Sequence, residues 1–171
     1  MVTTTATSRV YFDSCVFIDA IQETPGRIDH IRQIIEAAKR DELRVFASTL
    51  AIAEVAKPDK ATTAPTEEQL RLIHDFFEND YLARVQVDTP VARLAARIVR
   101  DHSVKPPDAI HLATALRARV DNFYTYDDGN GRAGCGLLRL NGAVSYDGSP
   151  ALRIVTPQDF AKGSLFGGAA G

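Results

Sequence analysis

Hydrophobic and polar positions along the chain follow two periods, one typical of strands and one typical of helices. Short apolar runs that are rich in β-branched and aromatic residues predict strands. Apolar residues three or four positions apart predict helices, and the clearest such pattern places Val91, Ala95 and Ile98 on one face. The expected strands cover residues 10–12, 43–47, 85–87, 123–126 and 153–155.

Turn and capping residues mark the ends of the helices that separate these strands. Thr66 and Gln69 form a capping-box pattern at the start of one helix. Thr89 is expected to cap the next helix, with Pro90 at its first position, and Pro107 is expected to open a later one. Helices are therefore expected after the first strand and from about residues 28, 49, 66, 89 and 107.

Strands that alternate with helices indicate βαβ units with right-handed crossovers. The chain therefore predicts an α/β fold, a three-layer α/β/α sandwich around a mostly parallel central sheet. The Gly-rich segment 129–150 departs from the alternation, and its apolar residues from Leu137 to Val144 predict a small hairpin. We expect one domain over residues 9–160, a flexible leader over 1–8 and a flexible tail over 161–171.

Composition and charge are those of an ordinary globular protein, with 45% hydrophobic residues and a net charge of −2. There is no overall basic excess, although local basic groups can still bind phosphates. The leader lacks the apolar core of a signal peptide, and no run approaches the roughly 20 apolar residues that span a membrane. Two cysteines without metal-site spacing predict a reducing compartment, so we expect a cytoplasmic protein that does not bind membranes. Cys15 is expected to be a small apolar residue rather than a nucleophile.

Four acidic residues are the candidate functional residues. Asp13 ends the first strand and Asp127 follows the fourth, while Glu54 and Asp108 lie near the starts of helices. Each of them alone has an ordinary alternative as a loop acid, a solvent-facing acid, a helix-capping acid or a turn residue. In a parallel sheet, however, ligand sites form beyond the carboxyl ends of the strands. The topology can therefore bring all four acids to one edge.

Carboxylates that converge in this way repel one another. Two of them about 5 Å apart cost roughly 3 kcal/mol at an effective dielectric constant near 20. A hard divalent cation removes this cost, and ligand sets made only of oxygen suit Mg²⁺ or Mn²⁺. The acidic cluster thus fits metal-assisted hydrolysis of a phosphodiester.

Four segments resemble, in their order and spacing, the acidic motifs of PIN-domain ribonucleases. They are Tyr11-Phe12-Asp13-Ser14, Ala53-Glu54-Val55, the run PDAIHLATA that begins at Pro107, and Tyr124-Thr125-Tyr126-Asp127. The Asp-Ala-Ile-His-Leu-Ala run is the most specific of them, and residues 154–157 resemble a late strand of the same family. The similarity extends over about residues 9–160, and the size of the chain resembles the VapC toxins of bacterial toxin–antitoxin modules.

The resemblance implies a Mg²⁺- or Mn²⁺-dependent endoribonuclease that a cognate antitoxin holds inactive. The catalytic and metal-binding residues that it implies are Asp13, Glu54, Asp108 and Asp127. Ser14 and Thr125 would support them by hydrogen bonds. The expected partners are an RNA substrate, a small antitoxin protein and a second copy of the chain in a homodimer. The long segment 129–150 departs from the family's usual pattern, so it bears on substrate contacts and oligomer geometry.

Residues beside the four acids have competing interpretations. Asp128 competes with Asp127, which we prefer because it directly follows the expected strand and matches the family's Thr-x-Asp spacing. His111 lies one helical turn after Asp108 and is expected to be a neutral structural histidine beside the site rather than a proton shuttle. Asp19 is expected on a solvent-exposed face.

Two other functions are alternatives at this point: a non-cleaving PIN-like module that binds RNA or regulates, and a metal-dependent phosphatase that acts on a small ester. The complete set of four acids argues against the first. The second would need an Asp-x-Asp pattern in its haloacid-dehalogenase-like form, but Cys15 stands two positions after Asp13. Lys105, Arg132 and Arg139 are candidates for phosphate contacts, with ordinary surface charge as the alternative.

Overall fold

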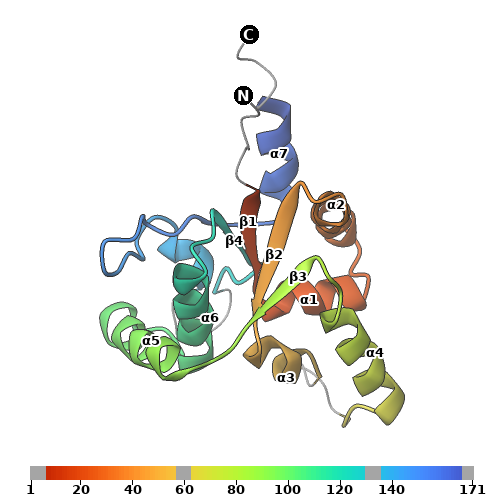
Figure 1. Ribbon diagram of the computed structural model, residues 1–171, viewed down its shortest axis with the longest axis horizontal. Helices are drawn as coiled ribbons and strands as arrows, with labels where there is room; N and C mark the ends of the chain where they lie inside the picture. Colours follow the sequence, from red (N-terminus) through yellow and green to blue (C-terminus); the bar gives the residue numbers. More distant parts are fainter. Residues whose placement is uncertain (1–6, 57–62, 130–135, 167–171) are drawn as a thin grey trace.

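A sheet of parallel strands forms the centre of the protein in the computed structural model, which describes residues 7–56, 63–129 and 136–166 (Figure 1). The strand order is β3-β2-β1-β4-β5, so the first strand of the chain lies in the middle. The strands are β1 (Ser8–Phe12), β2 (Leu43–Ser48), β3 (Leu82–Val85), β4 (Asn122–Tyr124) and β5 (Ile154–Val155). Val10 pairs with Val45, and Tyr11 pairs with Phe123. Because every pair is parallel, the carboxyl ends of the strands share one edge.

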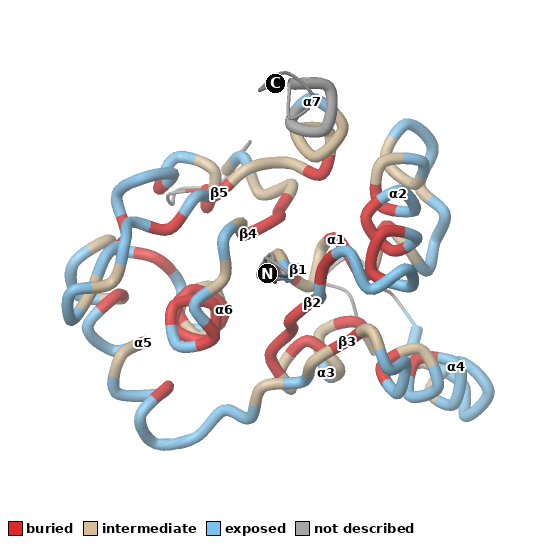
Figure 2. The backbone as a smooth tube through the Cα atoms, turned by 45° about the horizontal axis from the view of Figure 1, so that its top comes forward, coloured by how far each residue is buried: buried red, intermediate tan, exposed pale blue. Residues whose placement is uncertain are grey.

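Side chains that alternate along the strands create a core on each face of the sheet. Val10 and Phe12 face the first core, and Tyr11 between them faces the second. The helices that pack into the first core are α1 (Ser14–Ile21), α2 (Ile28–Lys39), α3 (Leu50–Ala56), α4 (Glu67–Phe77) and α7 (Gln158–Phe166). The second core is covered by α5 (Thr89–His102) and α6 (Pro106–Arg117). Figure 2 shows the buried segments concentrated along the central strands and along α6. The expected three-layer α/β/α sandwich is confirmed.

Capping residues start two helices as the sequence requires, although one cap differs from the expected residue. The Thr66 hydroxyl accepts a hydrogen bond from the Gln69 amide, and the Gln69 side chain accepts one from the Thr66 amide, which is the expected capping box. At α5 the cap is Asp88, whose carboxylate accepts a bond from the Val91 amide at 2.9 Å. The prediction that Thr89 caps this helix is wrong, because the carboxylate one residue earlier already reaches the free amide.

Two further expectations about local structure are corrected. The third strand is Leu82–Val85 rather than 85–87, because the buried Leu82 pairs with β2 while Val87 is 38% exposed. The expected hairpin after residue 129 is instead a short 3₁₀ helix, η1 (Leu137–Leu140), followed by turns. Its apolar residues are buried against the second core, so burial rather than strand pairing accounts for their spacing. In addition, α6 begins one residue before the expected Pro107.

The ends of the described chain differ slightly from the expected domain limits. β1 begins at Ser8, inside the expected leader 1–8, of which residues 1–6 lie outside the described part. α7 extends to Phe166, so the described part of the expected flexible tail is helical. Within residues 7–56, 63–129 and 136–166, no helix has both the length and the apolar character that crossing a membrane requires.

Candidate active site

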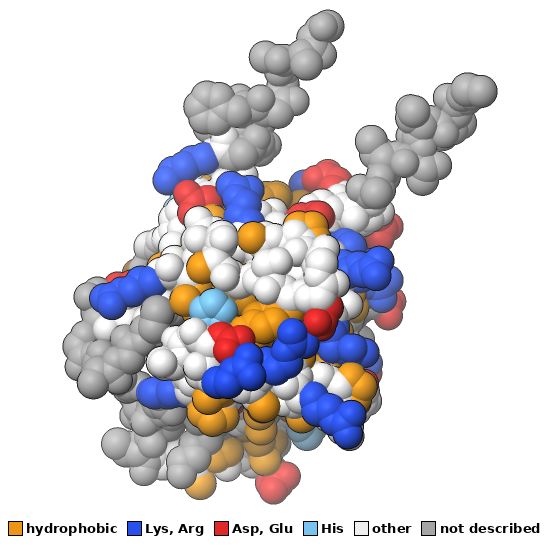
Figure 3. Space-filling view, turned by 90° about the vertical axis from the view of Figure 1, so that its left-hand side faces the viewer, with side chains coloured by type: hydrophobic (Ala, Val, Ile, Leu, Met, Phe, Trp, Pro, Cys, Tyr) orange, Lys and Arg blue, Asp and Glu red, His pale blue; other side chains and the backbone are white. Residues whose placement is uncertain are grey.

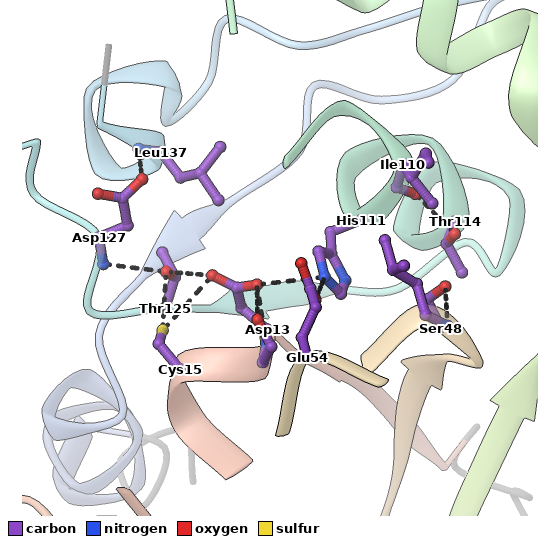
Figure 4. A network of polar contacts seen from close by, with 12 residues as sticks. Asp13, Cys15, Ser48, Glu54, Ile110, His111, Thr114, Thr125, Asp127 and Leu137 are labelled. Carbon is purple, nitrogen blue, oxygen red and sulfur yellow. Dashed lines mark hydrogen bonds and ion pairs between the residues drawn. The ribbon is translucent and has the colours of Figure 1, made fainter. Parts of the chain in front are cut away.

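Asp13 lies where β1 ends and α1 begins, and several hydrogen-bond donors surround its carboxylate (Figure 4). The side chain caps α1, because Oδ1 accepts a hydrogen bond from the Ser14 amide at 2.8 Å. The Thr125 hydroxyl donates to Oδ2 at 2.8 Å, and the Cys15 thiol lies 3.4 Å from the same oxygen. The residue is only 5% exposed. These donors offset the cost of burying an ionised carboxylate.

Thr125 links Asp13 to Asp127 through a single hydroxyl group. Besides donating to Asp13, its Oγ1 accepts a hydrogen bond from the Asp127 amide at 3.0 Å. The Asp127 carboxylate in turn accepts bonds from the backbone amides of Gly129 and Leu137, both at 3.1 Å. Asp127 therefore ties the start of η1 to the segment that follows β4. The hydroxyl fixes the relative position of the two acids.

Glu54 reaches the site from α3 and meets His111 from α6. The Glu54 carboxylate lies 2.6 Å from His111 Nε2, and the same nitrogen is 3.7 Å from Asp13 Oδ1. The other ring nitrogen, Nδ1, lies 2.8 Å from the hydroxyl of Tyr11. That hydroxyl accepts a hydrogen bond from the Ser48 amide at 2.9 Å. His111 thus connects two strands of the sheet to the acidic site.

The charge state of His111 is set by opposing influences. Burial lowers the pKa of its imidazole, because the ring is only 1% exposed. The hydrogen bond to Glu54 and the negative charges of Asp13, Glu54 and Asp108 raise the pKa, and together they place it above its ordinary value. His111 is buried beside the site, and the surrounding acids favour its protonated form, whereas the sequence suggested a neutral ring.

Asp108 lies in the first turn of α6, and its carboxyl group is the one whose negative charge the neighbouring groups disfavour. Burial raises the pKa of its carboxyl, and the negative charges of Asp13 and Asp127 raise it further, to about 6. The charges of His111 and Lys105 only partly offset this rise. Among the described residues, none donates a hydrogen bond to this carboxylate or forms an ion pair with it. An added cation would therefore relieve more repulsion here than elsewhere in the site.

The donor set fits a hard divalent cation in its chemistry. Asp13, Asp108 and Asp127 offer carboxylate oxygens, and the charges of Asp13 and Asp127 raise the pKa of Asp108. Across the described segments, however, no three His, Cys, Asp or Glu side chains are placed to hold a metal ion together. Glu54 is engaged by His111, and Asp127 is engaged by backbone amides. A shared ion would have to replace some of these hydrogen bonds.

The remaining residues singled out by the sequence lie around these acids. Ser14 supports Asp13 mainly through its amide, since its hydroxyl is 3.5 Å from Oδ1. Asp128 is exposed, whereas Asp127 is half-buried and its carboxylate faces Leu137 (Figure 4). Cys15 is more than an apolar filler, because its sulfur accepts a hydrogen bond from the Tyr126 amide at 3.3 Å.

The expectation that Asp19 faces solvent is wrong. The residue is 7% exposed and forms an ion pair with Arg27 at 2.8 Å. The Arg27 guanidinium lies 4.2 Å from the ring centroid of Tyr126, next to the acidic site in sequence. Pairing with Arg27 offsets the cost of burying Asp19, and the helical pattern of α1 alone did not indicate such a partner.

The candidate phosphate-binding cations lie on the surface. Lys105 and Arg139 are exposed, and Arg132 lies outside the described residues. Figure 3 shows the face that carries α5, on which Lys and Arg side chains are interspersed with Asp and Glu side chains. Two arginines of α5 are paired, Arg97 with Asp147 at 3.0 Å and Arg100 with Asp101 at 2.6 Å.

Sequence reasoning missed the contribution of Tyr11. It reads as one more apolar residue of the first strand, yet its buried hydroxyl contacts His111 and Ser48. A tyrosine in a fully buried strand needs a partner for its hydroxyl, and this requirement is the signal that could have found it.

Comparison with known proteins places these observations in a wider context. The PIN domain family matches residues 10–134 of the chain. No curated protein matches the sequence. A toxin–antitoxin complex from Klebsiella pneumoniae is similar in structure, with a TM-score of 0.56 and 21% identity over 86% of this chain and 97% of that chain.

Two other solved structures show the same similarity of fold. VapC20 from Mycobacterium tuberculosis, a toxin that cleaves the sarcin–ricin loop, has a TM-score of 0.57 and 12% identity, over 69% of this chain and 89% of that chain. VapBC2 from Rickettsia felis, bound to a DNA fragment from its promoter, has a TM-score of 0.56 and 14% identity, over 86% of this chain and 98% of that chain. At these identities the similarity concerns the fold.

Proposed function

The chain belongs to the PIN domain family, and from this premise we propose that it is a metal-dependent endoribonuclease, the toxin of a toxin–antitoxin pair. The observation that carries the proposal is that the charges of Asp13 and Asp127, joined through the Thr125 hydroxyl at the carboxyl edge of the sheet, raise the pKa of Asp108. Glu54 joins them through His111, which lies 3.7 Å from Asp13. Such a cluster of oxygen ligands suits the hydrolysis of phosphodiesters.

The residues that would hold Mg²⁺ or Mn²⁺ are Asp13, Glu54, Asp108 and Asp127. A bound divalent cation supplies Lewis acidity, since it neutralises charge on phosphate oxygens and lowers the pKa of water. Thr125 orients Asp13 and Asp127 through its hydroxyl group. Asp108, which has no hydrogen-bond donor among the described residues, is the acid most free to meet an incoming cation.

Substrate and partners follow from the same family premise. An RNA backbone brings phosphates to the acidic edge, and the exposed Lys105 and Arg139 are the cations proposed to contact them. Because two of the similar structures are toxin–antitoxin complexes, we include a small antitoxin protein in the proposal. A homodimer remains an expectation from the family resemblance. We also propose a cytoplasmic location, which two cysteines without metal-site spacing suggest.

Cleavage of purified cellular RNA tests the proposal directly. The protein is incubated with RNA in Mg²⁺, in Mn²⁺ or in a chelator, and the new RNA ends are mapped by sequencing. We expect cleavage at defined sites only with a cation, and we expect Asp13→Asn to abolish it. Asparagine also caps helices, so this variant retains the start of α1 while losing a charged ligand.

The matched control is Asp29→Asn, which removes an exposed acid on α2 that is remote from the site. This variant is expected to cleave like the wild type. Cleavage by Asp13→Asn at the wild-type rate contradicts the proposal. Turnover of a generic phosphate ester without RNA cleavage would favour a phosphatase instead.

A further inference from the structure

A line of hydrogen bonds runs through the protein interior from β2 to the acidic site. It joins the Ser48 amide to the Tyr11 hydroxyl at 2.9 Å, that hydroxyl to His111 Nδ1 at 2.8 Å, and His111 Nε2 to Glu54 at 2.6 Å. Tyr11 is 0% exposed and His111 is 1% exposed, so water does not compete for these groups. The line starts in the second core and ends at the acids, where Figure 4 shows His111 against Glu54 beside Asp13.

The direction of each hydrogen bond follows from the number of protons available. The Ser48 amide can only donate, so the Tyr11 oxygen accepts at that point. An ionised Glu54 carboxylate can only accept, so His111 Nε2 carries the proton that faces it. Nδ1 of a neutral ring then has a lone pair free to accept the Tyr11 proton. In the neutral ring, the proton of His111 therefore resides on Nε2.

This proton has one acceptor within hydrogen-bond distance. Glu54 lies 2.6 Å from Nε2, whereas the nearest oxygen of Asp13 lies 3.7 Å away. Among the described residues, His111 is the only one that donates a hydrogen bond to Glu54. The Glu54 carboxylate is therefore held only while Nε2 carries a proton, as it does in the protonated ring and in the Nε2–H form of the neutral ring.

We propose that His111 is a positioning residue whose neutral tautomer is set by Tyr11 and Glu54 together, so that its Nε2–H holds the Glu54 carboxylate beside Asp13. The part that concerns cleavage rests on the proposed function, because it assumes that Glu54 serves the acidic site. The part that concerns the tautomer is a statement about the free protein. A residue that only fills space at this place would need neither a polar atom nor a defined tautomer.

The tautomer is tested by NMR of the metal-free protein labelled with ¹⁵N-histidine, recorded at alkaline pH where the imidazole is neutral. The chain has four histidines, so the signals of His111 are those that disappear in His111→Gln. We expect the Nε2–H form in the wild type and a mixture of both forms in Tyr11→Phe. Tyr81→Phe, which removes a tyrosine hydroxyl far from the site at the start of β3, is expected to leave the spectrum unchanged. An Nδ1–H form in the wild type, or no change in Tyr11→Phe, overturns the proposal.

The positioning role is tested by a pair of amide variants assayed for RNA cleavage. Glutamine can place a donor where Nε2 lies, whereas asparagine places one near Nδ1 and falls short of Glu54. We expect His111→Asn to lower kcat about 10–100-fold with little change in KM, as is usual for residues that orient metal ligands. His111→Gln is expected to restore most of this loss. Circular dichroism confirms that each variant is folded before it is assayed.

Equal losses of kcat in the two amide variants overturn the positioning role, because the donor to Glu54 would then be irrelevant. If the wild type cleaves no RNA under any condition, the proposed function fails, and the NMR comparison still decides whether Tyr11 sets the tautomer of His111. The two proposals can therefore fail separately.

Discussion

At the scale of single residues, Asp13 and Asp108 differ in the hydrogen bonds that their carboxylates accept. Asp13 receives hydrogen bonds from the Ser14 amide and the Thr125 hydroxyl, both at 2.8 Å. Asp108 receives none among the described residues, and burial together with neighbouring acids raises its pKa to about 6. A carboxyl group whose pKa is raised by burial and by neighbouring acids is typical of functional sites.

Replacing Asp108 should therefore stabilise the metal-free protein. A folded-state pKa above the unfolded value means that the wild type loses stability from this group as pH rises from about 4 to about 6. After solvent screening of this half-buried carboxyl, we expect Asp108→Asn to be more stable by about 1–2 kcal/mol at pH 7.5 and by almost nothing at pH 4. Urea unfolding at a series of pH values measures the difference.

The control for this experiment is Asp75→Asn, which removes an exposed acid on α4. Its stability is expected to follow that of the wild type at every pH. A destabilised Asp108→Asn at pH 7.5 would show that this carboxylate has favourable partners and would contradict the account above.

At the scale of elements, α5 begins beside two neighbouring residues that can both cap a helix, and only one of them does so. Asp88 makes the capping hydrogen bond to Val91, and Thr89 is the first residue of the helix. We expect Asp88→Ala to lower the free energy of unfolding by about 1 kcal/mol. Thr89→Ala should change it by less, since alanine is the better helix former. Chemical denaturation of both variants measures the contrast, and a larger loss in Thr89→Ala would reverse the assignment.

The segment after β4 shows why some elements escaped sequence analysis. Its apolar residues Leu137, Leu140 and Val144 suggested a hairpin, but they are buried against α5 and α6 in a short helix and turns. Local pattern shows that these residues are buried, not what covers them. By contrast, α4 was predictable because its cap and its apolar face agree.

At the scale of the whole molecule, the parallel sheet gathers acids that are far apart in sequence. If they bind a cation, Mg²⁺ should raise the melting temperature by linkage. At 100 times the Kd, we expect a rise of about 5–10 °C at pH 8. The rise should shrink below pH 6, because protonation of Asp108, whose pKa is about 6, competes with the ion. Differential scanning calorimetry measures both effects.

The comparison variant for this measurement is Asp13→Asn, which lacks one proposed ligand. Its melting temperature is expected to respond little to Mg²⁺ at either pH. A full rise in this variant would mean that the cation binds elsewhere on the molecule.

The sequence by itself determined the order of strands and helices, the family and the choice of Asp13, Glu54, Asp108 and Asp127 as candidates. Period, capping chemistry and motif spacing are local, so they can be recognised without coordinates. Only the tertiary structure decided the partners of these acids: Thr125 between two carboxylates, His111 against Glu54, and the buried ion pair of Asp19. Hydrogen bonds between elements depend on how those elements pack, and a single chain's local pattern carries no record of that packing.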